Sequence, residues 1–243
     1  MRLNIATWNI HKGIGGIDRR YRLQRIVDVL APLHADIALL QEVAEAMPRA
    51  GNDTQLHLLS QALAMPHIAY SPQHRFSVGG YGNAVLSRWP LSNVVELDLT
   101  IGTRKKRGAL QTRARVRWGR RTRSIVITNL HLGLAGSERG AQLDRFLASQ
   151  PYRGLHARTP VILGGDLNDL WGTLGPKYLL PHGFARAGPL APTFPAWLPV
   201  RPLDGLFMRG DLDVVDAGPL KSELTRRASD HLPLLATVKL QKK

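Results

Sequence analysis

Cysteine is absent from this chain of 243 residues, which excludes disulfide bonds and thiolate chemistry. No apolar run approaches about 18 residues, so the sequence contains no candidate transmembrane helix. Residues 1–8 enter an expected strand without the apolar leader of a signal peptide. These absences together predict a cytoplasmic protein.

Acidic residues are scarce, and their scarcity is uneven. The chain has 33 Lys and Arg against 18 Asp and Glu, a formal net charge of +15. Residues 99–137 contain no acidic residue at all but carry ten cations: Arg104, Lys105, Lys106, Arg107, Arg113, Arg115, Arg117, Arg120, Arg121 and Arg123. Such concentrated charge favours a polyanionic partner. Nucleic acid is the partner we expect, and an anionic membrane surface is the alternative.

The pattern of apolar residues predicts one domain over residues 1–243, without repeats or long linkers. Helices are expected at residues 19–33, capped by Asp18, and at 54–64 and 137–150. Strands are expected at residues 3–6, 35–40, 83–87, 94–100, 110–118, 123–128, 159–163, 203–208, 212–215 and 232–240. Strands flanked by helices, with hairpins between them, predict an α/β sandwich with mixed sheets.

One expected strand carries three arginines on a single face. Arg113, Arg115 and Arg117 alternate with apolar or small residues along residues 110–118. A strand of this kind cannot have both faces covered by protein. We therefore expect it at or near a sheet edge, in a hairpin with residues 123–128, with its arginines in solvent or on a ligand.

Short polar motifs end or adjoin the apolar runs from one end of the chain to the other. They are Thr7-Trp8-Asn9, Leu40-Gln41-Glu42, Asn129-Leu130-His131, Gly165-Asp166-Leu167-Asn168, Leu203-Asp204 and Ser229-Asp230-His231. Strand ends are where α/β proteins usually build their sites. Carboxylate and amide oxygens with histidines are what a divalent-cation phosphoesterase needs.

In this order the motifs resemble the endonuclease/exonuclease/phosphatase superfamily, whose fold is DNase I-like. The resemblance spans nearly the whole chain and includes Tyr81-Gly82-Asn83-Ala84-Val85-Leu86-Ser87-Arg88, which is similar to the family's Tyr-containing strand. It implies a four-layer α/β/β/α sandwich of two mixed β-sheets. It also implies a metal-dependent phosphoester hydrolase.

The resemblance and the residue chemistry agree on roles. Glu42 is the predicted metal ligand, with Asp230 and Asn9 in the same shell, for Mg²⁺ with Mn²⁺ as the alternative. Asp166 is expected to orient or deprotonate the attacking water, and Asn168 to donate its amide to the phosphate.

Two histidines complete the predicted machinery. His231 is expected beside the phosphate, with Asp204 as its orienting partner. His131 is a second candidate proton donor or phosphate contact, and Tyr81 is another phosphate contact. Predicted substrate-binding residues are Arg113, Arg115, Arg117, His11 and Asn83. His11 departs from the family pattern, in which some members carry an Asp, and this leaves the metal shell open.

Three functions follow, and we expect a monomer for each. The first is a nuclease that cleaves DNA or RNA, with the basic segment on phosphates flanking the scissile bond. The second is a phosphodiesterase or phosphatase acting on phospholipids or their head groups, where residues 197–200 (Trp-Leu-Pro-Val) contact the membrane. The third is a polyanion-binding module that has lost catalysis, which the intact motifs disfavour.

Overall fold

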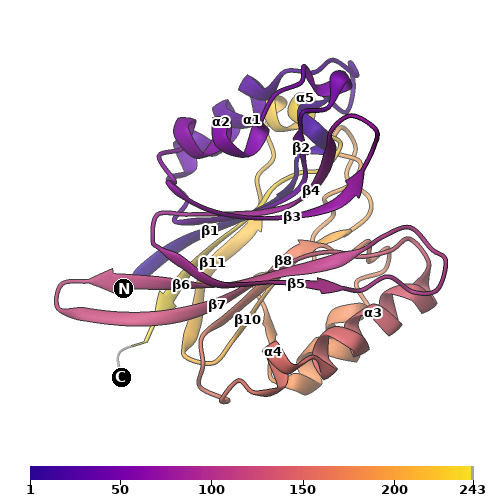
Figure 1. The fold of residues 1–243 in the computed structure, drawn as a ribbon. Coiled ribbons are helices and arrows are strands. Elements are labelled where there is room, and N and C mark those ends of the chain that lie inside the picture. The colour runs from indigo at the N-terminus through magenta and orange to yellow at the C-terminus, as the bar shows by residue number, and fades with distance from the viewer. Residues whose placement is uncertain (242–243) are drawn as a thin grey trace.

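Two six-stranded β-sheets pack face to face in the computed structural model, which describes residues 1–241 (Figure 1). The first sheet has the order β11-β12-β1-β2-β4-β3 and the second β5-β6-β7-β8-β10-β9. The strands of the first sheet are β1 (Arg2–Asn9), β2 (Ile37–Glu45), β3 (His67–Arg75), β4 (Gly80–Ser87), β11 (Leu212–Pro219) and β12 (Leu234–Leu240). Those of the second are β5 (Leu91–Asp98), β6 (Gly108–Trp118), β7 (Arg121–His131), β8 (Val161–Asp166), β9 (Ala185–Arg186) and β10 (Asp204–Arg209).

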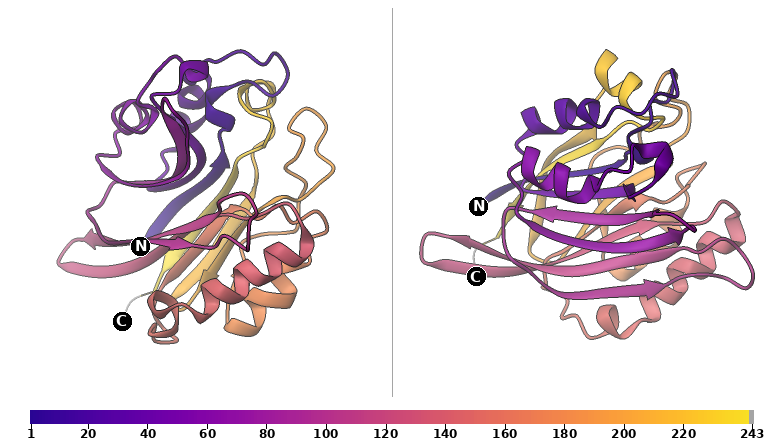
Figure 2. Two further views of the ribbon diagram at one scale, coloured as in Figure 1. Left: turned by 45° about the vertical axis from the view of Figure 1, so that its right-hand side comes forward. Right: turned by 45° about the horizontal axis from the view of Figure 1, so that its top comes forward.

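Helices cover the outer face of each sheet and complete four layers (Figures 1 and 2). Over the first sheet lie α1 (Leu23–Leu30), α2 (Gln55–Ala62) and α5 (Glu223–Ala228); over the second lie α3 (Gly136–Ala148) and α4 (Gln150–Arg153). Shorter helical turns span His11–Gly13, Ala31–Leu33, Pro48–Ala50, Gly175–Leu179 and Leu180–His182. Within residues 1–241, no helix is both long and apolar enough to cross a membrane. The predicted α/β/β/α sandwich of two mixed sheets is confirmed.

The main core lies between the sheets. Ile5 and Leu39 of the first sheet pack in one buried cluster with Ile127 and Ile162 of the second. Two further clusters lie between each sheet and its helices, around Trp8 and Phe146 respectively. Both faces of the central strands are therefore buried, which explains why β1, β2, β7 and β8 read as nearly continuous apolar runs.

The arginine strand lies where its pattern predicts. β6 is the second strand from the edge of its sheet and forms a hairpin with β7. Ala114 and Val116 are buried between the sheets, whereas Arg115 and Arg117 are exposed on the outer face. This hairpin projects beyond the helices, on the left of Figure 1.

One predicted helix cap is wrong. The helix expected at residues 19–33 starts at Leu23, after Arg22, and no side chain caps it. Asp18 instead accepts hydrogen bonds from the Arg25 guanidinium and from the Arg20 amide. A bidentate pair with an arginine two turns away holds this carboxylate more strongly than a backbone amide would.

The topology gathers strand ends at one edge of the sandwich. β1 runs parallel to β2, and β7 runs parallel to β8, so these four strands end on the same side. β10 and β12 run antiparallel to them and begin there, since Asp204 pairs with Asp166 and Leu234 with Thr7. We call this the site edge; it lies opposite the tip of the β6–β7 hairpin.

Candidate functional site at one edge of the sandwich

A buried polar bridge fixes the two sheets to each other just behind the site edge. The Asn129 amide, on β7, donates to the Leu40 and Ala84 carbonyls of the first sheet, each at 2.8 Å. Its oxygen accepts from Gln41 at 2.7 Å. All three polar groups of this side chain are thus satisfied across the interface, as a fully buried amide requires. The bridge places the end of β7, with His131, against the end of β2, with Glu42.

A second bridge occupies Asn83, one of the predicted substrate-binding residues. This side chain is fully buried on β4, and its amide donates to the Gly108 carbonyl of β6 at 3.3 Å. The structure therefore places Asn83 between the sheets, where its Oδ1 has no hydrogen-bond partner among the described residues.

Three buried side chains form the centre of the site. His231 Nδ1 lies 2.8 Å from Asp204 Oδ2, and His231 Nε2 lies 3.7 Å from Asp166 Oδ2. The Thr193 hydroxyl donates to the same Asp204 oxygen, and the Trp8 indole donates to the His231 carbonyl. These contacts fix both the ring and the backbone of His231. Asp204 is the orienting partner that the sequence predicts.

The charges of this centre follow from its environment. Burial opposes a charge on His231, but the Asp204 and Asp166 carboxylates outweigh it and raise the pKa of the imidazole to about 10. Burial and the Asp204 carboxylate raise the pKa of Asp166 to about 6, against the lowering effect of His231. At neutral pH the site therefore holds an imidazolium beside a carboxylate poised to accept a proton.

Two asparagines orient Asp166 from opposite sides. Asn9 Nδ2 donates to Oδ2 at 3.0 Å, and the Asn168 backbone amide donates to Oδ1 at 2.9 Å. The Asn168 side chain donates one hydrogen to the Leu132 carbonyl at 2.9 Å, which leaves the second for a ligand. Asn168 has a φ of 49°, a left-handed conformation that asparagine tolerates better than most residues.

His131 lies on the same carboxylate, with Nε2 3.4 Å from Asp166 Oδ2. Burial, together with the Arg107 guanidinium, lowers the pKa of this imidazole well below its usual range. His131 is neutral at pH 7, so this environment favours a hydrogen bond to phosphate over proton donation to a leaving group.

Glu42 stands in a strained turn of β2. The strand shifts register between Leu40 and Val43, and Glu42 has a φ of 55°. Burial acts to raise the pKa of this carboxyl, but the Lys12 ammonium outweighs it and lowers the pKa to about 2. The ammonium contacts the carboxylate directly. A partly exposed, ionised carboxylate is the kind of ligand that a divalent cation needs.

The other predicted metal ligands lie around His11. The His11 amide donates to Asn9 Oδ1 at 3.0 Å, and His11 Nδ1 lies 3.8 Å from Asp230 Oδ1. The same imidazole lowers the pKa of Glu42. Oxygen donors from β1 and from the loop before β12 thus lie beside His11, whose ring also contacts the Ile14 carbonyl. Together with Glu42 they are hard oxygen donors, the ligand type that Mg²⁺ prefers.

A different trio is packed closely enough to hold a metal. Ligand atoms of Asp166, Asp204 and His231 lie within 4.8 Å of one another, the one such group in residues 1–241. Within this trio, Asp204 Oδ2 already contacts His231 Nδ1 and accepts from the Thr193 hydroxyl. An acid and a base held this close are also suited to proton transfer.

Cations and aromatic rings line the side of the site next to Glu42. Lys12 Nζ lies 4.8 Å from the centre of the Tyr81 ring, and Lys105 Nζ lies 5.7 Å from it. Tyr81 is thereby brought beside the predicted metal ligand. Arg107 is 6% exposed, makes no ion pair with a described carboxylate, and leaves Nε without a partner.

Sequence reasoning missed two of these residues. Arg107 was one cation among ten in the basic segment, and its burial beside His131 has no signature in the sequence. Thr193 lies in a proline-rich stretch, 11 residues before the Asp204 that it contacts. Nothing in the residue types of that stretch indicates this pairing.

The structure does not bring the three arginines of β6 to this cluster. Gly108 pairs with His131, so Arg113 lies five residues and about 17 Å further along the strand. Arg115 and Arg117 lie further still. All three side chains point to the outer face of the sheet, whereas the Asn129 side chain, near the end of β7, points to the other sheet. They are not positioned to contact a phosphate at Asp166.

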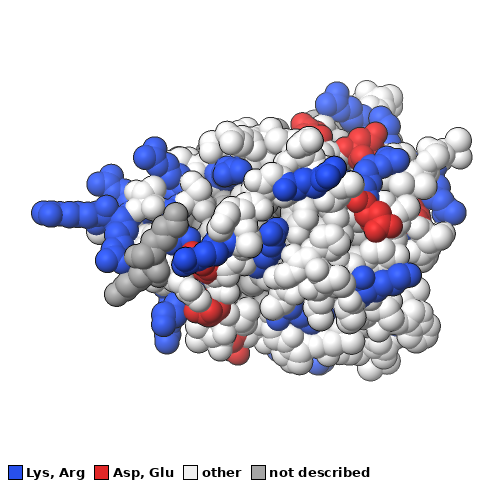
Figure 3. All heavy atoms as spheres, turned by 90° about the horizontal axis from the view of Figure 1, so that it is seen from below, with Lys and Arg blue, Asp and Glu red and all other residues white. Residues whose placement is uncertain are grey.

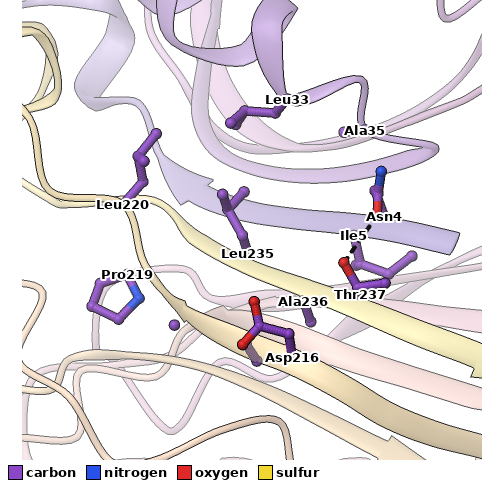
Figure 4. Close-up of a pocket in the computed structure, with 12 residues that line it drawn as sticks. Asn4, Ile5, Leu33, Ala35, Asp216, Pro219, Leu220, Leu235, Ala236 and Thr237 are labelled. Carbon is purple, nitrogen blue, oxygen red and sulfur yellow. Dashed lines mark hydrogen bonds between the residues drawn. The ribbon is translucent and has the colours of Figure 1, made fainter.

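A separate pocket opens on the first sheet, away from the cluster (Figure 4). Its volume is about 380 Å³, and Leu33, Leu220, Leu235 and Asp216 line it together with Thr237, which donates a hydrogen bond to Asn4. No predicted site residue belongs to it. Its polar groups do not converge, so we assign it no role in the chemistry.

Comparisons with known proteins find similarity along nearly the whole chain. Residues 6–231 match the model of the Endonuclease/Exonuclease/phosphatase family. The uncharacterized protein YbhP of Escherichia coli K12 is 32% identical over 249 residues, which cover 97% of this chain and 96% of YbhP, and YbhP of Shigella flexneri gives the same values.

Solved structures share the fold at lower identity. An endonuclease/exonuclease/phosphatase from Beutenbergia cavernae has a TM-score of 0.80 at 23% identity, and the match covers 98% of this chain and 72% of the Beutenbergia chain. A mannosyl-6-phosphatase of Bacteroides thetaiotaomicron has a TM-score of 0.75 at 17% identity, covering 98% and 99%. Danio rerio TDP2, complexed with a single-strand DNA product, has a TM-score of 0.71 at 17% identity, covering 98% and 99%.

Proposed function

The chain belongs to the endonuclease/exonuclease/phosphatase family, and we propose that it hydrolyses phosphodiesters with the help of a divalent cation, Mg²⁺ or alternatively Mn²⁺. One observation carries the proposal. Four segments far apart in the sequence bring an ionised Glu42, a raised-pKa Asp166 and an Asp204-bound imidazolium of His231 to a single edge. These are a cation ligand, a base for water and a positive group for phosphate.

The chain's own residues supply most of the reaction. Asp166, held by Asn9 and the Asn168 amide, accepts a proton from water as the water oxygen bonds to phosphorus. The bond from phosphorus to the leaving oxygen then breaks. The His231 imidazolium stabilises the negative charge that builds on the phosphate and is placed to supply a proton to the leaving oxygen.

Further groups hold the phosphate in place. The free hydrogen of the Asn168 amide, the neutral His131 ring and the buried Arg107 guanidinium are the donors at this edge. Glu42, with Asp230 and Asn9, would hold a divalent cation, which would neutralise phosphate charge when bound. The Lys12 ammonium contacts the same Glu42 carboxylate.

Two substrate classes share this chemistry. A nucleic acid is the substrate predicted from the net charge of +15, and the basic residues 104–107 support it because Gly108, which follows them, pairs with His131. A phospholipid or head-group phosphodiester is the alternative, and it is favoured by the exposed apolar side chains on the loops around the site. The arginines of β6 support neither at the site itself.

The test is hydrolysis of a soluble diester, bis(p-nitrophenyl) phosphate, with Mg²⁺, Mn²⁺ or EDTA. Plasmid DNA, single-stranded DNA, RNA and anionic phospholipid vesicles follow as natural substrates. We expect metal-dependent turnover that EDTA abolishes and that Glu42→Ala loses. Asp144→Asn is the matched control, since it removes one exposed carboxylate from α3, remote from the site. Turnover that persists in EDTA contradicts the proposal.

A further inference from the structure

The most exposed apolar side chains of the protein are not scattered over its surface. Within residues 1–241, eight large apolar side chains are more than half exposed. All eight lie on loops at the site edge, around the cluster of Asp166 and His231. Exposed apolar residues are ordinary when they occur singly, but a concentrated set marks a surface that meets another apolar phase.

The hairpin of residues 194–201 carries three of them. Trp197, Leu198 and Val200 extend from its tip into solvent. At its base, the Ala196 amide donates to the Asp230 carbonyl at 2.7 Å, and the Phe194 ring lies 5.0 Å from the His231 ring. The tip therefore stands directly beside the site.

The loops that follow β7 and β8 carry two more. Leu134 is 71% exposed, two residues beyond Leu132, whose amide donates to the Asp166 carbonyl. Trp171 is 67% exposed, three residues beyond Asn168. The guanidinium of Arg201 lies 4.5 Å from the centre of the Trp171 ring and so orients the indole.

The remaining three exposed apolar side chains lie on loops of the first sheet. Phe76 and Val78 form the tip of the β3–β4 hairpin, where the Phe76 ring lies 6.1 Å from the Tyr81 ring. Ile17 follows Gly16, whose absent Cβ leaves room for the Asp230 backbone to pass at contact distance. We call these eight side chains the apolar rim; they come from both sheets and surround the site.

Cations alternate with the rim. Arg104, Lys105 and Lys106 are exposed on the loop before β6, and Lys105 lies over the Tyr81 ring. Arg201 stacks on Trp171, within the rim itself. Indole rings beside Lys and Arg, around exposed aliphatic tips, are the composition of a surface that rests in the head-group region of a bilayer.

We propose that the apolar rim docks the site edge onto an anionic lipid bilayer, so that the phosphodiester cleaved is one carried by lipid head groups. This inference rests on the proposed function and narrows its substrate class. Five of the eight rim residues are aliphatic, and aliphatic tips do not stack on nucleic-acid bases as aromatic rings do. A protein bound to all the loops would cover the site, whereas a bilayer presents its head groups to it.

The test measures binding to vesicles, separately from turnover. The variant Trp171→Ala/Trp197→Ala/Leu198→Ala removes rim side chains from two loops. The control Leu58→Ala/Val94→Ala/Val215→Ala removes three apolar side chains that are also exposed but lie on α2, β5 and β11. Both are compared with the parent protein by co-sedimentation with phosphatidylglycerol/phosphatidylcholine vesicles and with phosphatidylcholine alone, after thermal unfolding confirms that each variant folds.

We expect the parent and the control triple to bind the anionic vesicles alike, and the rim triple to bind at least about tenfold more weakly. Lipids brominated in the acyl chains should quench the parent's tryptophan emission, because Trp171 and Trp197 enter the bilayer, and this quenching should vanish in the rim triple. Equal binding by the rim triple overturns the inference. The inference is also overturned if the parent binds single-stranded oligonucleotides but not vesicles, and the rim triple loses that oligonucleotide binding. If the parent protein binds vesicles as expected but does not hydrolyse the soluble diester, the proposed function is overturned and the membrane docking is not.

Discussion

The two ends of the β6–β7 hairpin differ in how they carry charge. At the site edge, His131 ends β7 among buried carboxylates, imidazoles and Arg107, and the exposed side chains around them are the apolar rim with the cations Arg104, Lys105 and Lys106. At the tip, Arg115, Arg117, Arg120 and Arg121 are exposed, and none forms an ion pair with a carboxylate of residues 1–241. Figure 3 shows several basic side chains at this projecting end, on the left of the view, and others spread over the rest of that face.

Charged residues therefore act in two different ways at the two ends of this hairpin. Solvated arginines at the tip act through long-range attraction, which salt screens within about 10 Å. Buried charges at the site edge act through short contacts and shifted pKa values, which salt hardly reaches. Exposed cations at either end of the hairpin can therefore attract polyanions, whereas the chemistry depends on the buried charges at the site edge.

The largest effect that sharpens this comparison comes from Asp166. Asp166→Asn removes the base while keeping the size of the side chain and its contact with the Asn168 amide. We expect kcat on the soluble diester to fall by about 10²- to 10⁴-fold, as is usual for a positioned base. His231→Ala should cause a loss of the same order.

The control for both is Asp144→Asn, measured in the same steady-state assay with thermal unfolding to verify folding. Near-normal kcat in Asp166→Asn would remove Asp166 from the reaction and assign the base to another group of the site.

A smaller effect is expected from pH. Asp166 must be ionised to accept a proton, and its pKa of about 6 means that kcat rises as pH passes upward through 6. Below that value the rate should fall about tenfold per unit. His231 must be protonated, and its pKa of about 10 means that activity is lost above that pH.

Asp204→Asn tests the assignment of the alkaline limb. It removes the carboxylate that raises the pKa of His231, so the limb should move to lower pH while the acid limb changes less. A profile whose alkaline limb stays in place in Asp204→Asn would assign that limb to another group.

Arg107 should have an intermediate effect. Arg107→Met keeps the bulk of the buried chain but removes a charged donor, and we expect about a tenfold loss of kcat/KM, the usual worth of one hydrogen bond to a charged group. The guanidinium also lowers the pKa of His131, so that pKa should rise in the variant, as followed by NMR titration. Arg107→Lys is the companion variant, since it retains the charge. An unchanged kcat/KM in Arg107→Met would show that the guanidinium serves packing alone.

Much of the fold could be predicted because its signals are local. β1, β2, β7 and β8 are buried on both faces and read as apolar runs, and β6 shows strict alternation. β3 escaped prediction because Pro72 and several polar residues interrupt its pattern. It is the edge strand of its sheet, where a missing amide hydrogen and a wet outer face cost little.

The sequence identified residues that the structure brings to one edge, but not how they contact one another. Each motif ends or begins a strand, and the resemblance to the family supplied the roles. The sequence does not encode locally that Asn83 bridges two sheets, that Arg107 is buried, or that Thr193 meets Asp204. Nor does alternation along β6 say which face of its sheet the other sheet covers, and this decides that Arg113 points away from His131.

The smallest effect is expected from the hairpin tip, and it tests the comparison most directly. Arg115→Ser/Arg117→Ser removes two exposed charges more than about 17 Å along β6 from Gly108, on the outer face of the sheet. We expect kcat/KM on the soluble diester to change less than about twofold, and stability to change by less than about 0.5 kcal/mol, as for most surface substitutions. On plasmid DNA the same variant distinguishes long-range attraction from direct contact. If the arginines only attract DNA, their removal should lower the rate at low salt, and this loss should disappear as salt rises. A deficit that persists at high salt would mean that a long polyanion wraps from the site edge around to the outer face. The two ends of the hairpin would then form one binding surface.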